Sequence, residues 1–290
     1  MAKDKTKPRP DLIEKRQAAQ EQQAAKKRKE RRRIFVNWLI GLTIIGLCTW
    51  GLMTVINHVE DEAGTDLVNG KEADQITPPH AAIDGLSIVG QAETAPAANA
   101  PMVDLYSDFQ CEGCIAKMQY FGQGLVKLAE EGRIVLRYHL SMAKDMALEN
   151  TNSGRANVAA ACADTVNHFL KYSQVIFEAG AGALAAGAPV AFTTDQLAND
   201  YAVASGLNGD DLKNFQQCFK QRATSTFVTA MSTANATQPM GNYETGITVT
   251  DDLFVFANGQ EVDLLLAFNA EGDVNIEELL TLLTPAVDEP

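Results

Sequence analysis

The stretch that decides the fold is Val103–Cys114, which reads VDLYSDFQCEGC. It begins as a short apolar run typical of a buried strand and ends in a CxxC motif. Beyond it, apolar residues recur every three or four positions, which predicts a helix over residues 115–131. We therefore expect Cys111 at the N-terminus of a helix, where unpaired backbone N–H groups and the helix dipole stabilise a thiolate. Cys114, one turn later, is expected on the same face and within reach of the first sulfur.

A CxxC motif can also supply half of a zinc site or an inert structural bridge. A zinc site needs a second pair of ligands. The other cysteines, Cys48, Cys162 and Cys218, are far apart in the sequence, and the four histidines show no ligand spacing. The pattern therefore favours dithiol–disulfide exchange, with a redox-active disulfide and neither a metal nor another cofactor.

Residues 34–56, IFVNWLIGLTIIGLCTWGLMTVI, are 23 residues without a charge. At about 1.5 Å per residue such a helix spans roughly 34 Å, enough to cross the hydrocarbon core of a bilayer. The basic region before this run is too long for a signal peptide, and no small-residue cleavage pattern follows it. The sequence therefore predicts a permanent transmembrane helix over 34–56.

The charge differs sharply between the two sides of this apolar run. Residues 1–33 carry 13 Lys and Arg against 5 Asp and Glu, a net charge of +8, so the rest of the chain carries −21 of the total of −13. The positive-inside rule places residues 1–33 in the cytoplasm and the chain after residue 56 outside the cell membrane. Disulfides persist in that compartment. Beside a membrane span, the basic run is interpreted as a topology signal that meets anionic lipid, and no nucleic-acid partner is expected.

An acidic, turn-prone linker is predicted over residues 57–81, and one α/β domain over 82–290. A short strand is expected within 85–90, before the strand and helix of the CxxC region. RIVLRYHL at 133–140 alternates as the next strand. A strand–helix–strand unit of this length predicts parallel strands joined by a right-handed crossover.

The middle of the domain, about 145–237, is expected to be a helical insertion. Its Gly- and Ala-rich segment 179–191 is predicted to be a mobile surface loop, and a capping box is predicted at 193–196. The segment 252–268, DLFVFANGQEVDLLLAF, reads as two strands joined at Asn258-Gly259, a strong hairpin signal. A helix over 273–283, capped by Asp273 or Asn275, closes the domain.

VDLYSDFQCEGC, the helical block with SGRANVAAACA at 153–163, and the terminal hairpin resemble the DsbA-like branch of the thioredoxin superfamily. More narrowly, the chain is similar to the membrane-anchored extracytoplasmic thiol–disulfide oxidoreductases of actinobacteria. The resemblance covers roughly residues 82–285. It implies a thioredoxin-like fold with a helical insertion, with Cys111 as the attacking sulfur and Cys114 as the resolving one. Relatives often carry a second cysteine pair in the insertion, which implies a bridge between Cys162 and Cys218, against the alternative of two buried free thiols.

The chain departs from this family at two places. The residues between the cysteines are Glu112 and Gly113, where relatives usually place proline first. A carboxylate at Glu112 is expected to raise the pKa of the Cys111 thiol and to weaken its oxidising drive. The family also has a cis-proline in a loop that faces the active sulfur. Here no proline is present, and that position must be occupied by Thr250, Asp251, Asp252 or Leu253. Because a non-proline cis bond costs about 3 kcal/mol, this loop is expected to be trans.

The leading hypothesis is a membrane-tethered thiol–disulfide oxidoreductase that acts on unfolded or reduced exported proteins and exchanges electrons with an unidentified membrane partner. The alternative is a binding or scaffold protein of the same fold with weak or no turnover, favoured by the missing proline and the acidic residues of the loop. A hydrolase would need a nucleophile with a histidine partner. His139 is the nearest candidate, and nothing in the pattern around it indicates a catalytic base.

Overall fold

The computed structural model of this chain describes residues 74–90, 94–269 and 272–284. The chain divides between Asn69 and Gly70, and all described residues belong to the second part. The predicted basic segment 1–33, the predicted transmembrane helix 34–56 and residues 57–73 of the predicted linker lie outside the described residues. No helix in the described ranges is both long enough and apolar enough to cross a membrane.

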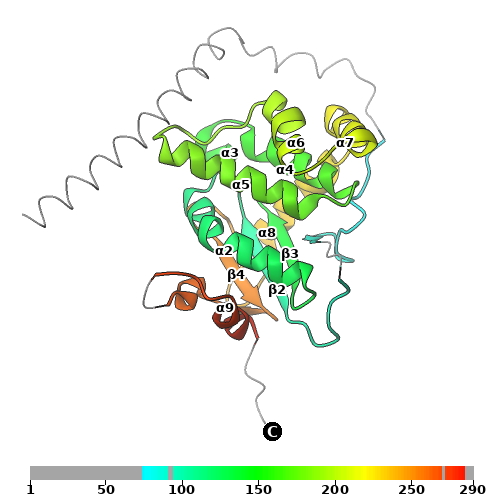
Figure 1. The fold of residues 1–290 in the computed structure, drawn as a ribbon. Helices are drawn as coiled ribbons and strands as arrows, with labels where there is room; N and C mark the ends of the chain where they lie inside the picture. Colours follow the sequence, from blue (N-terminus) through cyan, green and yellow to red (C-terminus); the bar gives the residue numbers. More distant parts are fainter. Residues whose placement is uncertain (1–73, 91–93, 270–271, 285–290) are drawn as a thin grey trace, which may run out of the picture. The chain divides into compact units, whose positions relative to one another are not determined.

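Five strands form one sheet (Figure 1): β1 (Ile88–Val89), β2 (Met102–Ser107), β3 (Val135–Leu140), β4 (Phe254–Ala257) and β5 (Gln260–Glu261). Their order across the sheet is β1-β3-β2-β4-β5. The central pair, β2 and β3, is parallel, with Leu105 opposite Tyr138, and the other neighbouring strands are antiparallel. Helix α2 (Glu112–Glu130) connects β2 to β3. The predicted strand–helix–strand unit with parallel strands is therefore confirmed.

Most of the other helices form an insertion between β3 and β4: α3 (Ala143–Leu148), α4 (Asn152–Asp164), α5 (Phe169–Ala185), the π-helix η1 (Gln196–Asp200), α6 (Tyr201–Ala204), α7 (Gly209–Gln221) and α8 (Ser225–Thr237). The 3-10 helix η2 (Leu264–Ala267) and α9 (Ile276–Leu283) follow the terminal hairpin. In Figure 1, α3 to α7 gather at one end of the sheet, whereas α2 and α8 lie on its two faces. The element order is that of a thioredoxin-like α/β fold with a helical insertion.

The alternation of side chains along β2 and β3 explains this layering. Leu105 and Tyr138 face the side of the insertion helix α5, where the Tyr138 ring packs edge-on against Phe169 with ring centroids 5.1 Å apart. Asp104 and His139 face α8 instead, because His139 contacts Asn235 of that helix. The core beneath α2 is therefore apolar, whereas the opposite face of the sheet holds a buried polar cluster.

The predicted surface loop over 179–191 is wrong for residues 179–185, because α5 continues to Ala185. Only residues 186–191 of this segment lie outside a helix or strand. The small residues of this segment belong to a packed helix, and Gly180 lies where α5 meets α2. A Cβ atom at Gly180 would lie 2.9 Å from Cδ1 of Ile115, so the missing side chain allows α5 to approach α2 closely. The capping box is confirmed: Thr193 N–H donates to Oε1 of Gln196 at 2.9 Å, and Gln196 N–H donates to Oγ1 of Thr193 at 3.1 Å.

The terminal hairpin turns at Asn258 and Gly259, whose φ angles are 47° and 82°, as a tight hairpin turn with two positive φ angles requires. Its second strand is much shorter than predicted. Gln260 and Glu261 pair with β4, and Val262 N–H donates to the carbonyl oxygen of Val255 at 2.8 Å. The apolar residues from Leu264 form η2 instead of a longer strand. Asn275 caps α9, accepting hydrogen bonds from the N–H groups of the first turn.

The end of the segment predicted as a linker lies against the insertion. Ile76 N–H donates to the carbonyl oxygen of Ala223 at 2.8 Å. His80 binds the buried carboxylate of Asp164 through both its backbone N–H, at 2.9 Å, and its ring Nδ1, at 3.0 Å. The contacts of the domain thus begin before residue 82.

Candidate redox site

Cys111 is the N-cap residue of α2. Its backbone is extended, with φ −74° and ψ 113°, and the helix begins at the next residue. Its N–H donates to the carbonyl oxygen of Asp108 at 3.0 Å, which closes the turn that follows β2. Its Sγ accepts a hydrogen bond from the N–H of Cys114 at 3.0 Å. This sulfur therefore receives one of the unpaired donors at the helix N-terminus, the arrangement that stabilises a thiolate.

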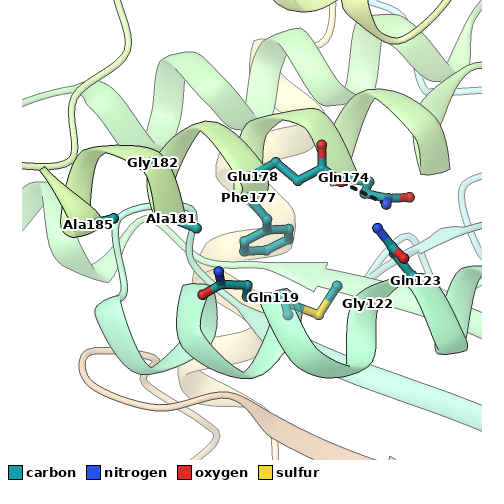
Figure 2. Close-up of a pocket in the computed structure, with 10 residues that line it drawn as sticks. Gln119, Gly122, Gln123, Gln174, Phe177, Glu178, Ala181, Gly182 and Ala185 are labelled. Atoms are coloured by element: carbon teal, nitrogen blue, oxygen red, sulfur yellow. Dashed lines mark hydrogen bonds between the residues drawn. The ribbon is translucent and has the colours of Figure 1, made fainter. Parts of the chain in front are cut away.

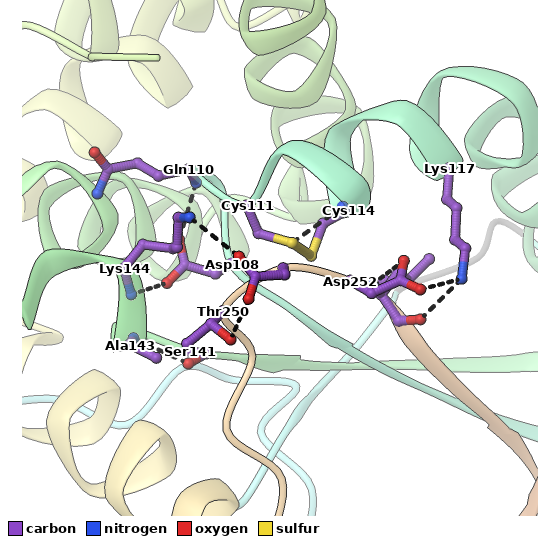
Figure 3. The surroundings of a disulfide bond; sticks show 12 residues. Asp108, Gln110, Cys111, Cys114, Lys117, Ser141, Ala143, Lys144, Thr250 and Asp252 are labelled. Atoms are coloured by element: carbon purple, nitrogen blue, oxygen red, sulfur yellow. Dashed lines mark hydrogen bonds and ion pairs between the residues drawn. A yellow bond between two sulfur atoms is a disulfide. The ribbon is translucent and has the colours of Figure 1, made fainter. Parts of the chain in front are cut away.

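Cys111 and Cys114 form a disulfide, with their Cα atoms 5.1 Å apart (Figure 3). Both residues have no exposed surface. Glu112, between them in sequence, is exposed, so solvent screens the charge that was expected to disfavour the Cys111 thiolate. The two sulfurs are thus brought together as predicted, in a position that no solvent reaches.

Asp108 is a site residue that the sequence analysis did not single out. It follows β2 directly and is fully buried. Its carboxyl accepts hydrogen bonds from Ser153 Oγ at 2.5 Å, from Gln110 N–H at 2.9 Å and from Lys144 N–H at 3.1 Å. Burial nevertheless dominates and raises the pKa of Asp108 to about 6, and the nearby carboxylate of Asp145 acts in the same direction.

Gln110 attaches the turn before Cys111 to the helical insertion. Its side-chain N–H₂ lies within hydrogen-bond distance of Asp145 Oδ1 (2.8 Å), Ser153 Oγ (2.7 Å) and Asn150 Oδ1 (3.1 Å). Its carbonyl oxygen accepts from the amide of Asn150 at 3.0 Å. Polar residues before a CxxC motif carry no recognisable sequence signal for such a network. The network appears only when the α3–α4 turn is folded against the end of β2.

The loop Thr250–Leu253, which we call the acidic loop, lies against the CxxC motif as the resemblance implies. A Cβ atom at Gly113 would collide with the carbonyl oxygen of Asp251 and lie 3.2 Å from Cα of Asp252. Glycine between the cysteines therefore lets the backbone of the acidic loop pass directly over the motif. No peptide bond in the described ranges is cis, so the expectation of a trans loop is confirmed.

Two lysines that the sequence analysis did not identify contact the acidic loop. Lys117 of α2 places Nζ 2.9 Å from Oδ2 of Asp252, and Lys144 of α3 places Nζ 3.7 Å from Oδ1 of Asp251. Asp251 and Asp252 are thus paired with cations from two different helices (Figure 3).

Cys162 of α4 and Cys218 of α7 form the second disulfide, with Cα atoms 5.7 Å apart. Both residues are buried, and Thr224 Oγ1 lies 3.6 Å from Cys162 Sγ. The bridge joins two helices of the insertion. The bridge implied by the resemblance is therefore present, and the two residues are not free thiols.

His139 is held on the α8 side of the sheet. Its Nε2 lies 2.8 Å from Oδ1 of Asp104, its Nδ1 lies 3.2 Å from Oδ1 of Asn235, and its ring stacks on Tyr106 with centroids 4.1 Å apart. Both ring nitrogens are engaged, so neither serves as a free base for a hydrolase. In the described ranges, no group of three or more His, Cys, Asp or Glu residues is arranged to hold a metal ion.

No protein-family model and no curated protein sequence matches this chain. Solved structures do match its fold. The MdbA protein of Actinomyces oris, a thiol-disulfide oxidoreductase, superposes with a TM-score of 0.53 at 19% identity, covering 74% of this chain and 96% of that one. The MdbA protein of Corynebacterium diphtheriae, also a thiol-disulfide oxidoreductase, superposes with a TM-score of 0.50 at 18% identity, covering 78% and 100%. The chain therefore shares the fold of these proteins, a thioredoxin-like α/β fold with a helical insertion.

Proposed function

We propose that this chain is a membrane-tethered thiol–disulfide oxidoreductase that exchanges disulfides in exported proteins. The observation that carries the proposal is the Cys111–Cys114 disulfide at the N-terminus of α2, directly after the central strand of a thioredoxin-like fold. A strand, a CxxC pair and a helix in this order bring the two sulfurs together at a helix N-terminus, where a thiolate is favoured.

The reaction follows from the geometry of the two sulfurs. A thiolate of a reduced protein attacks Sγ of Cys111, the bond to Cys114 breaks, and its electron pair leaves on Cys114. A second thiolate of the substrate protein then attacks the substrate sulfur that is bonded to Cys111 in the mixed disulfide. The product carries the new disulfide, and Cys111 leaves as a thiolate that the Cys114 N–H stabilises. In the opposite direction, Cys114 attacks Cys111 in the mixed disulfide and releases the reduced partner.

The proposed partners follow from the expected location of the domain. With residues 34–56 as the anchor and residues 1–33 in the cytoplasm, the domain would face the extracytoplasmic side and meet unfolded or reduced exported proteins. An enzyme working as an oxidase loses its disulfide at each turnover. A membrane redox partner would therefore have to accept electrons from the reduced Cys111–Cys114 pair.

The test uses the full-length chain, purified in a mild detergent because of its apolar segment. Its redox potential is measured against glutathione, and its oxidation of a reduced unfolded protein is compared with that of Cys111→Ser. Exchange by the wild type above the level of this variant supports the proposal. Equal rates for the two would contradict it.

The alternative, a binding or scaffold protein of the same fold, is favoured by one observation. Neither sulfur of the CxxC pair is exposed, and the acidic loop lies over the motif. A scaffold would bind the unfolded protein with the same affinity in the wild type and in Cys111→Ser, without turnover in either. Binding and exchange are therefore measured on the same samples.

The membrane part of the proposal has its own test. The full-length chain should sediment with membranes and resist extraction by salt, whereas a chain without residues 1–56 should be released. Protease added to cells whose membrane surface it can reach from outside should digest the domain. Release of the full-length chain by salt would argue against the anchor.

A further inference from the structure

The disulfide of the candidate site is closed to any partner in this structure. Cys111 and Cys114 both have 0% of their surface exposed. Thiol–disulfide exchange requires the attacking sulfur to approach Sγ of Cys111 along the line of the bond that breaks. Some segment that lies over the motif must therefore move before exchange can occur.

The acidic loop is the segment that the structure favours for this movement. Its backbone crosses Gly113 in direct contact, so it lies over the residues between the two cysteines. Val249 before it and Leu253 at its end are buried in the core, whereas Asp251 and Asp252 are exposed. The movable part is thus short: a tip of a few residues between two fixed points.

This tip is held by ion pairs to two different helices. Lys117 of α2 pairs with Asp252 at 2.9 Å, and its Nζ also lies 3.5 Å from the carbonyl oxygen of Leu253. Lys144 of α3 pairs with Asp251 at 3.7 Å. Figure 3 shows the two lysines on opposite sides of the acidic loop. The tip also has local hydrogen bonds, from Thr250 Oγ1 to Asp251 at 3.0 Å and from Leu253 N–H to Asp252 at 2.8 Å. The two lysines are the side chains that tie its carboxylates to the helices.

The exposure of the partners indicates which group of each pair is fixed. The lysine side chains are 22% and 14% exposed, whereas those of Asp252 and Asp251 are 53% and 88% exposed. The lysine side chains are mostly buried against the domain, and the two carboxylates are exposed to solvent. Opening the pairs therefore moves the loop and leaves the helices in place.

We infer that Lys117 and Lys144 are positioning residues that control how readily a partner sulfur reaches Cys111. They hold the acidic loop against Gly113, between the two cysteines, and exchange follows when their ion pairs with Asp252 and Asp251 open. The inference rests on the proposed function and deepens it by naming the residues that regulate access. In the open state the partner thiolate bonds to Sγ of Cys111, the Cys111–Cys114 bond breaks, and Cys114 leaves with the electron pair and takes a proton from solvent.

The experiment measures how fast a small thiol, 2-mercaptoethanol, reduces the Cys111–Cys114 disulfide in the oxidised full-length chain, through attack by its thiolate. Reaction is stopped by acid, and the new thiols are counted by alkylation and mass. Lys117→Gln and Asp252→Asn each remove one side of the same pair, so each should speed reduction about two- to fivefold, the range that a partly exposed ion pair allows. Lys144→Gln and Asp251→Asn should act in the same direction and by less, because that pair is longer and its carboxylate is more exposed.

The two kinds of variant separate access from simple electrostatics. Lys→Gln makes the site more negative and would slow an attacking thiolate, whereas Asp→Asn makes it less negative and would speed it. A common acceleration therefore reports release of the loop. Opposite changes in the two kinds of variant, or no change in either, would overturn the inference.

Lys127→Gln is the matched control. Lys127 lies on the same helix and pairs with Glu131 at 3.9 Å on the surface, away from the acidic loop, so its loss should leave the rate unchanged. Lys117→Arg keeps the charge and should keep the slow rate of the wild type. An acceleration in Lys127→Gln as large as that in Lys117→Gln would also overturn the inference.

This outcome is independent of the test of the proposed function. If the wild type fails to oxidise a reduced unfolded protein above Cys111→Ser, the proposed function fails, whatever the small thiol does. If the wild type oxidises that protein but the four loop variants react with 2-mercaptoethanol at the wild-type rate, only the inference about Lys117 and Lys144 fails.

Discussion

Replacing Asp108 by asparagine should remove a pH-dependent contribution to the stability of the domain. The ordinary pKa of an aspartate is 3.8, and burial raises that of Asp108 to about 6. A carboxyl whose pKa is higher in the folded state binds its proton more tightly there. Its contribution to stability is therefore present in full below pH 4 and is lost as the pH rises through about 6.

The magnitude follows from the difference between the two pKa values. At 1.36 kcal/mol per pKa unit, the full change in the free energy of unfolding is ~3 kcal/mol, and between pH 4.5 and pH 7.5 it is ~2 kcal/mol. The asparagine of Asp108→Asn stays neutral at both pH values, so the free energy of unfolding of this variant does not fall for this reason between pH 4.5 and pH 7.5. The substitution also disturbs the hydrogen bonds from Ser153 and the N–H of Lys144, which costs ~1–3 kcal/mol at either pH. That cost cancels when the two pH values are compared.

The assay is urea denaturation of the oxidised full-length chain, followed by circular dichroism at 222 nm at pH 4.5 and pH 7.5. The quantity of interest is the difference in unfolding free energy between variant and wild type, which should move by ~2 kcal/mol in favour of Asp108→Asn as the pH rises. Asp210→Asn is the control, because it removes the same charge from an exposed position on α7. If the difference for Asp108→Asn were the same at both pH values, the argument that burial holds this carboxyl protonated would be refuted.

Three other substitutions test the packing around the site. Gly113→Ala introduces a Cβ into the carbonyl oxygen of Asp251, so it should lower the free energy of unfolding by ~1–3 kcal/mol and speed reduction of the disulfide by 2-mercaptoethanol; unchanged stability and rate would mean that the acidic loop does not press on the motif. Replacing Cys162 and Cys218 together by alanine opens a loop with a sequence separation of 56 and should cost ~4 kcal/mol in thermal or urea unfolding, while the redox potential of the CxxC pair stays the same; a large change in that potential would tie the second bridge to the chemistry. Gly180→Ala should lower the free energy of unfolding, because its Cβ would press on Ile115. Gly182→Ala, whose Cβ meets nothing within 4 Å, should raise it by up to ~1 kcal/mol. Equal effects in urea denaturation would show that the close approach at Gly180 does not contribute to stability.

Much of the sheet and of the redox pair could be predicted because the signals are local. The run before Cys111, the helical spacing after it and the alternation near residue 137 need no distant partner to be recognised. The Asn258-Gly259 turn is similar, since the positive φ angles of a tight hairpin turn favour that dipeptide. The same local reasoning failed where packing decides. Glycine and alanine near residue 180 suggest a loop by propensity, yet the close contact with Ile115 makes them part of α5.

The residues around the disulfide could not be predicted, because each depends on segments far apart in the chain. Lys117 and Asp252 are separated by 135 residues, and Gln110 and Ser153 by 43. A lysine on a helix surface looks like any other solvated charge in the sequence. Its role appears only when the acidic loop is placed beside it.

The sequence was sufficient to predict a CxxC pair at the start of a helix after a buried strand, in an α/β domain with a helical insertion. Local hydrogen bonding and the period of apolar residues are sufficient for that. The tertiary structure alone decided how the pair is presented, fully buried, beside a carboxyl whose pKa is raised and beneath an acidic loop held by two lysines. Burial, desolvation and ion pairing arise between segments that meet only in the folded chain, and they set the accessibility of Cys111.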